Sequence, residues 1–364
     1  MRLKFRNEVH RNLLAELSRI SRGINTLQRA FESVSKACFG VHTRDFLGTM
    51  VEKDKKLNKI KNAEKLLRQG QYRKAIKIFE EINKAHPEEE SVLLMLAWAY
   101  YDSGAAQKAI KCLNMLLERE LQRKIFTGFA FDELVRIYKQ EKNFYKLVEI
   151  CEKAITAQPE DVGLLVELGN SYLQLGKAKE ACGTYEKIIR MEDDNPAFYC
   201  LWGEALFAAG LFLESEEAYV YAGKIDPEQA ANYCFKLTVL FQQAGNHKEA
   251  IRLIDKCIAL SPGNSLYYCS LGNSLIGLGQ IKEALESYEK AVQYGGHNSA
   301  GAYCNRLGNM LLKAKYFSQA AAVFEKAIKY ENIKPYYFGL VSAYRAMGLE
   351  DRADKIMRKV KKIG

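Results

Sequence analysis

Small and large apolar residues recur at fixed intervals along most of this chain. In the stretch YRKAIKIFEEI, Ala75 is followed four positions later by Phe79. The same pair returns at Ala109/Leu113, Ala181/Tyr185, Ala250/Ile254, Ala284/Tyr288, Ala320/Phe324 and Ala353/Met357. A spacing of four residues places both side chains on one face of a helix. The pattern therefore predicts a series of amphipathic helices in a regular repeat.

A second motif lies upstream of several of these helices and fixes the length of the repeat. It is a large residue followed by glycine, at Leu168-Gly169, Trp202-Gly203, Leu271-Gly272 and Leu307-Gly308. Aligning both motifs starts units near residues 56, 90, 128, 162, 196, 231, 265, 301 and 334. Each unit predicts two helices, the first ending at a glycine in the left-handed conformation. These glycines are Gly70, Gly104, Gly176, Gly210, Gly245 and Gly279.

This order of residues in a unit of about 34 resembles the tetratricopeptide repeat family. The resemblance covers residues 56–364, and the unit SLYYCSLGNSLIGLGQIKEALESYEKAVQYG matches nearly throughout. It implies an all-α fold, an α-α superhelix of about nine helical hairpins that bury their apolar faces against their neighbours. Glycine or alanine is expected where the two helices of a hairpin cross closely. The third unit departs from the pattern with Val135 and Leu147, and extra residues near 120–128 predict an irregular junction.

Residues 1–55 do not match the repeat and carry a heptad seam instead. Its apolar positions alternate in spacings of four and three, at Leu13, Leu17, Ile20, Ile24, Leu27, Phe31, Val34 and Cys38. The seam predicts an extra N-terminal amphipathic helix. Three interpretations stay open: the helix caps the first repeats, it associates with a second copy or a partner helix, or it lies on an anionic membrane. The last would use the flanking Arg11, Arg19, Arg22 and Arg29.

The net charge of +10 is concentrated at the two ends of the chain. Residues 1–55 contain 11 Lys and Arg against 6 Asp and Glu, whereas residues 128–334 contain 22 against 26. Such ends suit an acidic partner, nucleic acid or a membrane surface, and are also typical of solvated helix faces with a basic tail. A nucleic-acid-associated regulator is therefore an alternative, disfavoured because the charge lies mainly outside the central repeats and no recognition motif is present.

Sequence patterns typical of membrane spans, metal sites and enzymes are missing. The longest apolar run, residues 92–101, is shorter than the roughly 20 residues of a membrane span, and the N-terminus lacks the apolar core of a signal peptide. The nine cysteines form no CxxC pair, which favours buried thiols in a reducing compartment. No phosphate-binding loop, dinucleotide fingerprint, HExxH or GxSxG motif occurs. We expect a cytoplasmic, non-catalytic protein without cofactor or metal.

The family resemblance implies where a ligand lies, because the first helices of such units line a concave surface that holds extended peptides. The residue after Leu-Gly is one lining position, and here it is Asn170, Asn273 and Asn309. An asparagine offers a donor and an acceptor to a peptide main chain; the alternative is an exposed asparagine tolerated beside glycine. Neighbouring lining positions form an expected cationic patch with Arg136, Lys139, Lys236, Gln242, Asn305, Arg306 and Arg345. Aromatic positions on the same side are Trp98, Tyr101, Phe207 and Phe235.

The sequence as a whole therefore predicts a protein–protein interaction scaffold or adaptor. Its expected partners are other proteins or peptide segments bound in the concave groove, with possible self-association through residues 13–38. Peripheral membrane contact stays open, and nucleic acid is the less favoured partner. A second alternative is a non-catalytic subunit of an enzyme complex.

Overall fold

The computed structural model describes residues 42–123 and 126–361, with side chains from residue 55 onward except that of His297. In these ranges 18 α-helices pair into nine hairpins, one short 3-10 helix η1 (Pro227–Gln229) is present, and no strand occurs. The predicted all-α fold of about nine helical hairpins is confirmed. The heptad seam from Leu13 to Cys38 lies outside the described residues.

The chain divides into two compact units, residues 1–159 and 160–364. The first contains three hairpins, formed by α2 (His42–Arg68), α3 (Tyr72–Ala85), α4 (Glu90–Asp102), α5 (Ala106–Arg123), α6 (Phe129–Gln140) and α7 (Phe144–Ala157). The second contains six. Their helices are α8 (Val162–Gln174), α9 (Ala178–Met191), α10 (Pro196–Ala208), α11 (Phe212–Ile225), α12 (Ala230–Gln243), α13 (His247–Leu260), α14 (Ser265–Gly277), α15 (Ile281–Gly295), α16 (His297–Lys313), α17 (Phe317–Tyr330), α18 (Lys334–Ala346) and α19 (Glu350–Val360).

Two first helices begin earlier than the alignment of the repeats places them. Helix α2 begins at His42, so the expected division after residue 55 falls inside a helix. No glycine or proline occurs between residues 49 and 69, and nothing therefore interrupts the helix there. Helix α16 likewise begins at His297, directly after Gly296.

Glycine sits where the helices of a hairpin cross, as the sequence predicted. A Cβ atom on Gly169 would lie 2.6 Å from Cζ of Tyr185, and one on Gly272 would lie 2.5 Å from Cδ2 of Tyr288. Both tyrosines are at most 2% exposed. Each ring thus occupies the space that a longer side chain on the first helix would need. The same arrangement occurs at Gly308, with Phe324 as the ring.

The ends of the first helices are left-handed turns. All six glycines that the sequence singled out have positive φ, between 71° and 85°. Two hairpins place a lysine in this conformation instead, Lys142 at φ 55° and Lys315 at φ 65°. A side chain raises the energy of that conformation by about 1 kcal/mol relative to glycine. The turn geometry is therefore imposed by the stacking of the helices and not by glycine alone.

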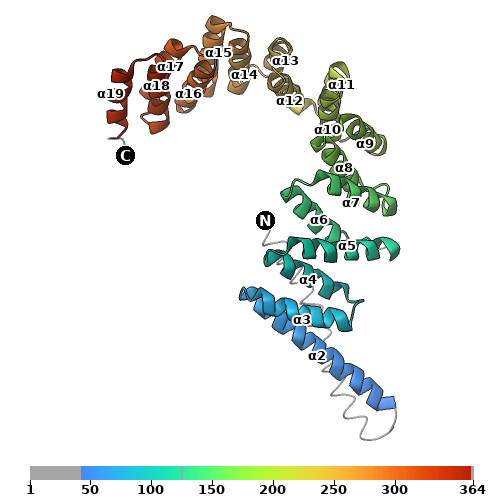
Figure 1. Ribbon diagram of the computed structural model, residues 1–364. Helices are drawn as coiled ribbons and strands as arrows, with labels where there is room; N and C mark the ends of the chain where they lie inside the picture. Colours follow the sequence, from blue (N-terminus) through green and yellow to red (C-terminus); the bar gives the residue numbers. More distant parts are fainter. Residues whose placement is uncertain (1–41, 124–125, 362–364) are drawn as a thin grey trace. The chain divides into compact units, whose positions relative to one another are not determined.

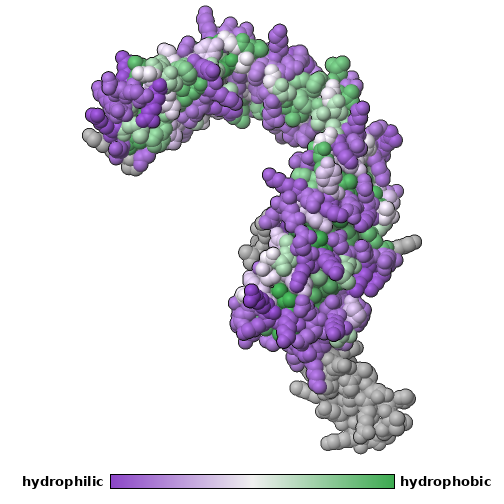
Figure 2. Space-filling model, in the orientation of Figure 1, coloured by the Kyte–Doolittle hydropathy of each residue, from purple (hydrophilic) through white to green (hydrophobic). Residues whose placement is uncertain are grey.

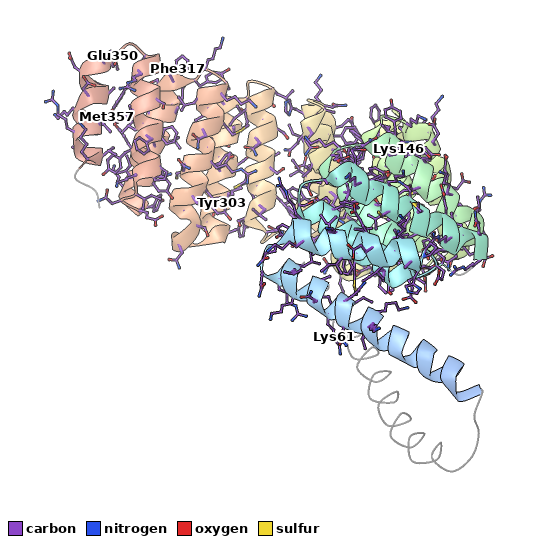
Figure 3. The ribbon with its side chains drawn as sticks, turned by 60° about the horizontal axis from the view of Figure 1, so that its bottom comes forward. Lys61, Lys146, Tyr303, Phe317, Glu350 and Met357 are labelled. Carbon is purple, nitrogen blue, oxygen red and sulfur yellow. The ribbon has the colours of Figure 1, made fainter. Side chains whose placement is uncertain are left out.

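Between hairpins, aromatic side chains fill the gaps. Tyr303 of α16 (Figure 3) covers Gly295, where a Cβ would lie 2.3 Å from its Cε2. Its hydroxyl lies 2.7 Å from Oγ of Ser265 at the start of α14. Leu307 and Leu311 of the same helix are buried in a cluster that joins α14 to α18. The core is thus a row of small clusters along the stack, as expected for a repeat protein.

The first helices of the second unit lie next to one another. Helix α10 contacts α12, α14 contacts α16, and α16 contacts α18. Figure 1 shows α12, α14, α16 and α18 along the inner edge of this unit, with α13, α15 and α17 along its outer edge. We call the surface that these first helices present the inner face. Polar residues of these helices include Asn170, Glu204, Lys236, Gln242, Asn273, Arg306, Asn309 and Lys313, of which Gln242, Asn273 and Lys313 line one hollow.

Candidate functional site

The three asparagines of the inner face have different surroundings. The hydroxyl of Tyr185 donates to Oδ1 of Asn170 at 2.9 Å, and that of Tyr288 donates to Oδ1 of Asn273 at 2.5 Å. Both asparagines are half-buried, whereas Asn309 is exposed and its hairpin carries Phe324, which has no hydroxyl. A tyrosine hydroxyl that occupies the amide oxygen leaves the amide NH2 group to donate elsewhere. Asn170 and Asn273 are therefore oriented donors, and Asn309 is not held in this way.

Glu204 takes the place of the asparagine in the fifth hairpin. It follows Gly203, on which a Cβ would lie 2.8 Å from Cε2 of Tyr219. Tyr219 is 2% exposed, yet its hydroxyl has no hydrogen-bond partner among the described residues. Burial raises the pKa of the Glu204 carboxyl, and the charge of Lys236 partly opposes this. The carboxylate forms neither a hydrogen bond nor an ion pair with the residues that the structure describes.

Gln242 is fully engaged within the protein. Its Nε2 donates to the carbonyl of Ser270 and to Oγ of Ser274, both at 2.7 Å. Its Oε1 accepts from Oγ of Ser270 at 3.0 Å. These bonds tie α12 to α14. Gln242 therefore has a structural role and also lines the hollow of the inner face, and its contact with a ligand stays a prediction.

A hollow of about 500 Å³ lies on the inner face between α12, α14 and α16. Its walls combine the apolar side chains of Val239, Ile276 and Met310 with polar groups. The polar lining consists of Gln242, Gln243, His247, Asn273 and Lys313. Gly277 also lines the hollow, and a Cβ there would lie 2.3 Å from Nε2 of His247. The hollow thus has apolar walls and a few hydrogen-bonding groups, as ligand-binding sites commonly do.

The predicted cationic patch is divided between the two units. Lys236, Asn305, Arg306 and Arg345 belong to the second unit, in which Lys236 and Arg306 are exposed. Lys236 lies over the ring of Tyr233, with Nζ 5.6 Å from the ring centroid. Arg345 lies 3.7 Å from the carboxylate of Glu350. The sequence did not single out Lys313, which brings a further cation to the same side.

In the first unit, Tyr101 of α4 and Arg136 of α6 contact each other and polar residues of α6. The guanidinium of Arg136 lies 4.3 Å from the ring centroid of Tyr101, and its Nη2 lies 2.6 Å from the Glu133 carboxylate. The hydroxyl of Tyr101 donates to Gln140 at 2.7 Å. Trp98 is half-buried, and Lys139 is exposed. Arg136 is thus neutralised by Glu133, so the cationic patch expected here is weaker than the sequence suggested.

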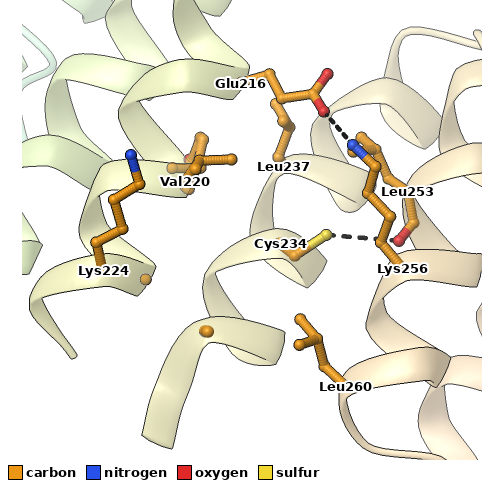
Figure 4. A pocket seen from close by; sticks show the side chains of 11 residues that line it. Glu216, Val220, Lys224, Cys234, Leu237, Leu253, Lys256 and Leu260 are labelled. Atoms are coloured by element: carbon orange, nitrogen blue, oxygen red, sulfur yellow. Dashed lines mark hydrogen bonds and ion pairs between the residues drawn. The ribbon is translucent and has the colours of Figure 1, made fainter. Parts of the chain in front are cut away.

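The sequence did not predict the outer pocket of about 220 Å³ between α11, α12 and α13 (Figure 4). Val220, Leu237, Leu253 and Leu260 supply its apolar lining. At its edge Glu216 of α11 accepts from Nζ of Lys256 at 2.7 Å. These contacts join neighbouring hairpins. Hydrophobic surface also gathers over α11 in Figure 2, where Leu211, Phe212 and Leu213 are exposed.

A bidentate ion pair reinforces this edge of the outer pocket. Nη1 and Nη2 of Arg252 lie 3.1 Å and 2.5 Å from the two carboxylate oxygens of Glu216. The hydrogen bond from Arg252 lowers the pKa of Glu216 to about 2, and Lys256 adds to the effect. The Glu216 carboxylate is therefore ionised in the folded protein at neutral pH.

The buried thiols have properties of structural residues. Burial raises the pKa of Cys200 and of Cys269 to about 11, which keeps both protonated at neutral pH. Cys234 is half-buried, and its thiol donates to the carbonyl of Leu253 at 3.5 Å. Over residues with described side chains, no group of three His, Cys, Asp or Glu is arranged to hold a metal ion. The same part of the chain has no helix long and apolar enough to cross a membrane.

Comparison with known families gives matches in both units. Models of the tetratricopeptide repeat match residues 66–125, 166–230, 266–294 and 301–333. Among solved structures, a tetratricopeptide repeat protein from Parabacteroides merdae is 15% identical and covers 70% of this chain and 99% of its own, with a TM-score of 0.45. A MamA protein is 22% identical and covers 49% of this chain and 96% of its own, with a TM-score of 0.38.

Curated proteins are similar over parts of their length. Protein O-mannosyl-transferase TMTC1 of Homo sapiens is 25% identical over 212 residues, or 55% of this chain and 23% of that protein. DnaJ homolog subfamily C member 7 of Mus musculus is 21% identical over 78% of this chain and 60% of its own length. Mitochondrial import receptor subunit TOM70 of Homo sapiens is 25% identical over 53% and 33%. The chain thus spans less than two thirds of each of these relatives.

Proposed function

Because this chain belongs to the tetratricopeptide repeat proteins, we propose that it is a non-catalytic scaffold that binds an extended peptide segment of a partner protein. Proteins built from such repeats generally serve in protein interactions. The binding surface that we propose is the inner face of the second unit, centred on the hollow between α12, α14 and α16. One observation carries the proposal: Asn273 lines this hollow, and its amide oxygen is held by Tyr288.

The NH2 group of Asn273 is the half of the amide that a ligand can use. With the oxygen occupied, the NH2 group of Asn273 is available to a carbonyl oxygen of a peptide main chain. Every residue of a peptide offers such a carbonyl, so the contact supplies affinity without demanding a particular side chain. Val239, Ile276 and Met310 add apolar contact beside it. Asn170 of α8 is held in the same way, by a hydrogen bond from the hydroxyl of Tyr185.

Two of the named relatives bear on this proposal. TOM70 is named as a subunit of an import receptor, which fits a protein that works in contact with other chains. The mannosyl-transferase name of TMTC1 belongs to a protein of which this chain spans 23%, and it gives no reason to propose an enzyme here.

The test separates the amide from the hydrogen bond that holds it. Peptides are selected from a random displayed library on the wild-type chain, and dissociation constants of the best binders are measured for Asn273→Ala and Tyr288→Phe. Both variants lose the Tyr288–Asn273 bond, but only Asn273→Ala loses the donor. We expect Asn273→Ala to weaken binding about fivefold to tenfold and Tyr288→Phe to weaken it by about twofold or less.

A control variant, Lys290→Ala on α15, changes an exposed residue of a second helix and should bind as the wild type does. Equal affinities of the wild type and Asn273→Ala for every selected peptide would show that the amide does not contact the ligand. Equal losses in Asn273→Ala and Tyr288→Phe would mean that only the local structure matters.

A further inference from the structure

The fifth hairpin breaks the pattern of the inner face in a way that bears on the ligand. In the fourth and seventh hairpins, a buried tyrosine hydroxyl donates to an asparagine on the first helix. The equivalent pair in the fifth hairpin is Tyr219 and Glu204, and they are not hydrogen-bonded to each other. The result is a fully buried hydroxyl without a hydrogen bond and a half-buried carboxylate without a hydrogen bond or ion pair, among the described residues.

This arrangement is unfavourable in the isolated protein. A polar group that is removed from water without a hydrogen bond costs free energy, and a carboxylate costs more than a hydroxyl. Burial raises the pKa of Glu204 for this reason. An asparagine at the same position would satisfy Tyr219, as Asn170 satisfies Tyr185. A group that supplies a positive charge to Glu204 would remove the larger of the two penalties.

The charges of the neighbouring helices make the position selective for a cation. Glu204 and Glu167 both raise the pKa of Tyr185 after the larger effect of burial, which places the two carboxylates near the same hydroxyl. The charge of Lys236 on α12 acts on Glu204, but Lys236 forms no ion pair with it among the described contacts. Further along the inner face the charges are positive, with exposed Arg306 and Lys313. The inner face therefore changes sign between α10 and α16.

We propose that Glu204, together with the unpartnered hydroxyl of Tyr219, forms a subsite on the inner face that takes the side chain of an arginine or lysine from a bound peptide. This subsite rests on the proposed peptide-binding function and adds a requirement to it. A guanidinium or ammonium group at this position donates hydrogen bonds to the carboxylate. The positive charges of Arg306 and Lys313 on α16 repel a cation from that end of the face, which favours one register of the peptide.

The subsite is tested with two pools of fluorescent, end-blocked octapeptides that differ at one fixed central residue. One pool carries arginine there, and the other carries citrulline, which has nearly the same shape without the charge. All other positions are random and uncharged. We expect the wild-type chain to bind the arginine pool about tenfold more tightly by fluorescence polarisation. In Glu204→Asn the ratio should fall to about one, because the carboxylate is lost while Tyr219 gains a partner.

The matched control is Glu214→Gln, which removes an exposed carboxylate from α11 of the same hairpin and should keep the tenfold ratio. Equal binding of the two pools to the wild type, or an unchanged preference in Glu204→Asn, overturns the subsite and leaves the peptide-binding function standing. If neither pool binds the wild-type chain, the peptide-binding function itself is overturned, and the subsite with it.

Discussion

Two glycine-to-alanine substitutions in the fourth hairpin should change stability in opposite directions. Gly169 in α8 faces Tyr185, whose Cζ, Cε1 and hydroxyl oxygen would lie 2.6, 2.8 and 3.0 Å from an added Cβ. A Cβ added to Gly183 in α9 would meet no atom within 4 Å beyond its chain neighbours and the backbone of its own helix. Both glycines lie in helices, so alanine gains about 1 kcal/mol in helix propensity at each site.

The loss of stability expected for Gly169→Ala follows from the lack of space around Tyr185. The ring is 0% exposed and cannot move into solvent, so overpacking costs about 1–3 kcal/mol. Displacing the ring also strains the hydrogen bond to Asn170, which is worth about 1 kcal/mol. After the gain in propensity, we expect Gly169→Ala to lose about 1–3 kcal/mol. Gly183→Ala should gain up to about 1 kcal/mol.

The assay is urea unfolding followed by circular dichroism, with amide hydrogen exchange in α8 and α9 to report the local free energy. Local readout is needed because repeat arrays need not unfold in one step. A Tyr185→Leu background removes the far end of the ring, and there Gly169→Ala should cost much less. If Gly169→Ala were as stable as the wild type, the close crossing of α8 and α9 would not limit the size of this residue.

Three further outcomes follow from the described contacts. Because the folded pKa of Glu216, about 2, lies below its ordinary value of 4.5, its stabilisation is complete above pH 4.5 and is lost as the pH falls towards 2. Wild type should therefore lose more stability than Glu216→Gln between pH 6 and pH 2.5 in urea titrations, and equal losses would contradict the ion pair. The thiols of Cys200 and Cys269, with pKa values of about 11, should not react with Ellman's reagent at pH 8. Replacing both by serine should therefore leave the number of fast-reacting thiols unchanged. A smaller number would show that these two thiols are not protected. Lys315→Gly should raise stability by about 1 kcal/mol because φ is 65°, and a lower urea midpoint would refute that strain.

The sequence predicted features that depend on contacts within one repeat. The spacing of Ala284 and Tyr288 identified a helix face, and Gly272 marked the crossing that the ring of Tyr288 fills. The left-handed glycines were predicted for the same reason, since a helix end requires a particular backbone conformation. These constraints act over about 30 residues and recur nine times, so a single chain reveals them.

Features that depend on a particular tertiary partner were not predicted. Gln242 was expected to face a ligand, and its bonds to Ser270 and Ser274 in the next hairpin were not foreseen. Arg136 was expected to contribute positive charge, but Glu133 neutralises it. The asparagine positions were identified, yet only the structure shows that tyrosines hold two of them. Glu204 could have been noticed as an acid at an asparagine position, because Trp202-Gly203 was already part of the alignment.

The most direct test of the central claim locates the bound peptide on the protein. A peptide selected on the wild-type chain is synthesised with a benzophenone group at its centre, irradiated in the complex, and the attachment sites are identified by mass spectrometry. The inner face predicts attachment to α8, α10, α12, α14 or α16, near residues such as Asn273 and Lys313. Attachment confined to the second helices, α9, α11, α13, α15 and α17, would contradict the claim that the inner face binds the peptide.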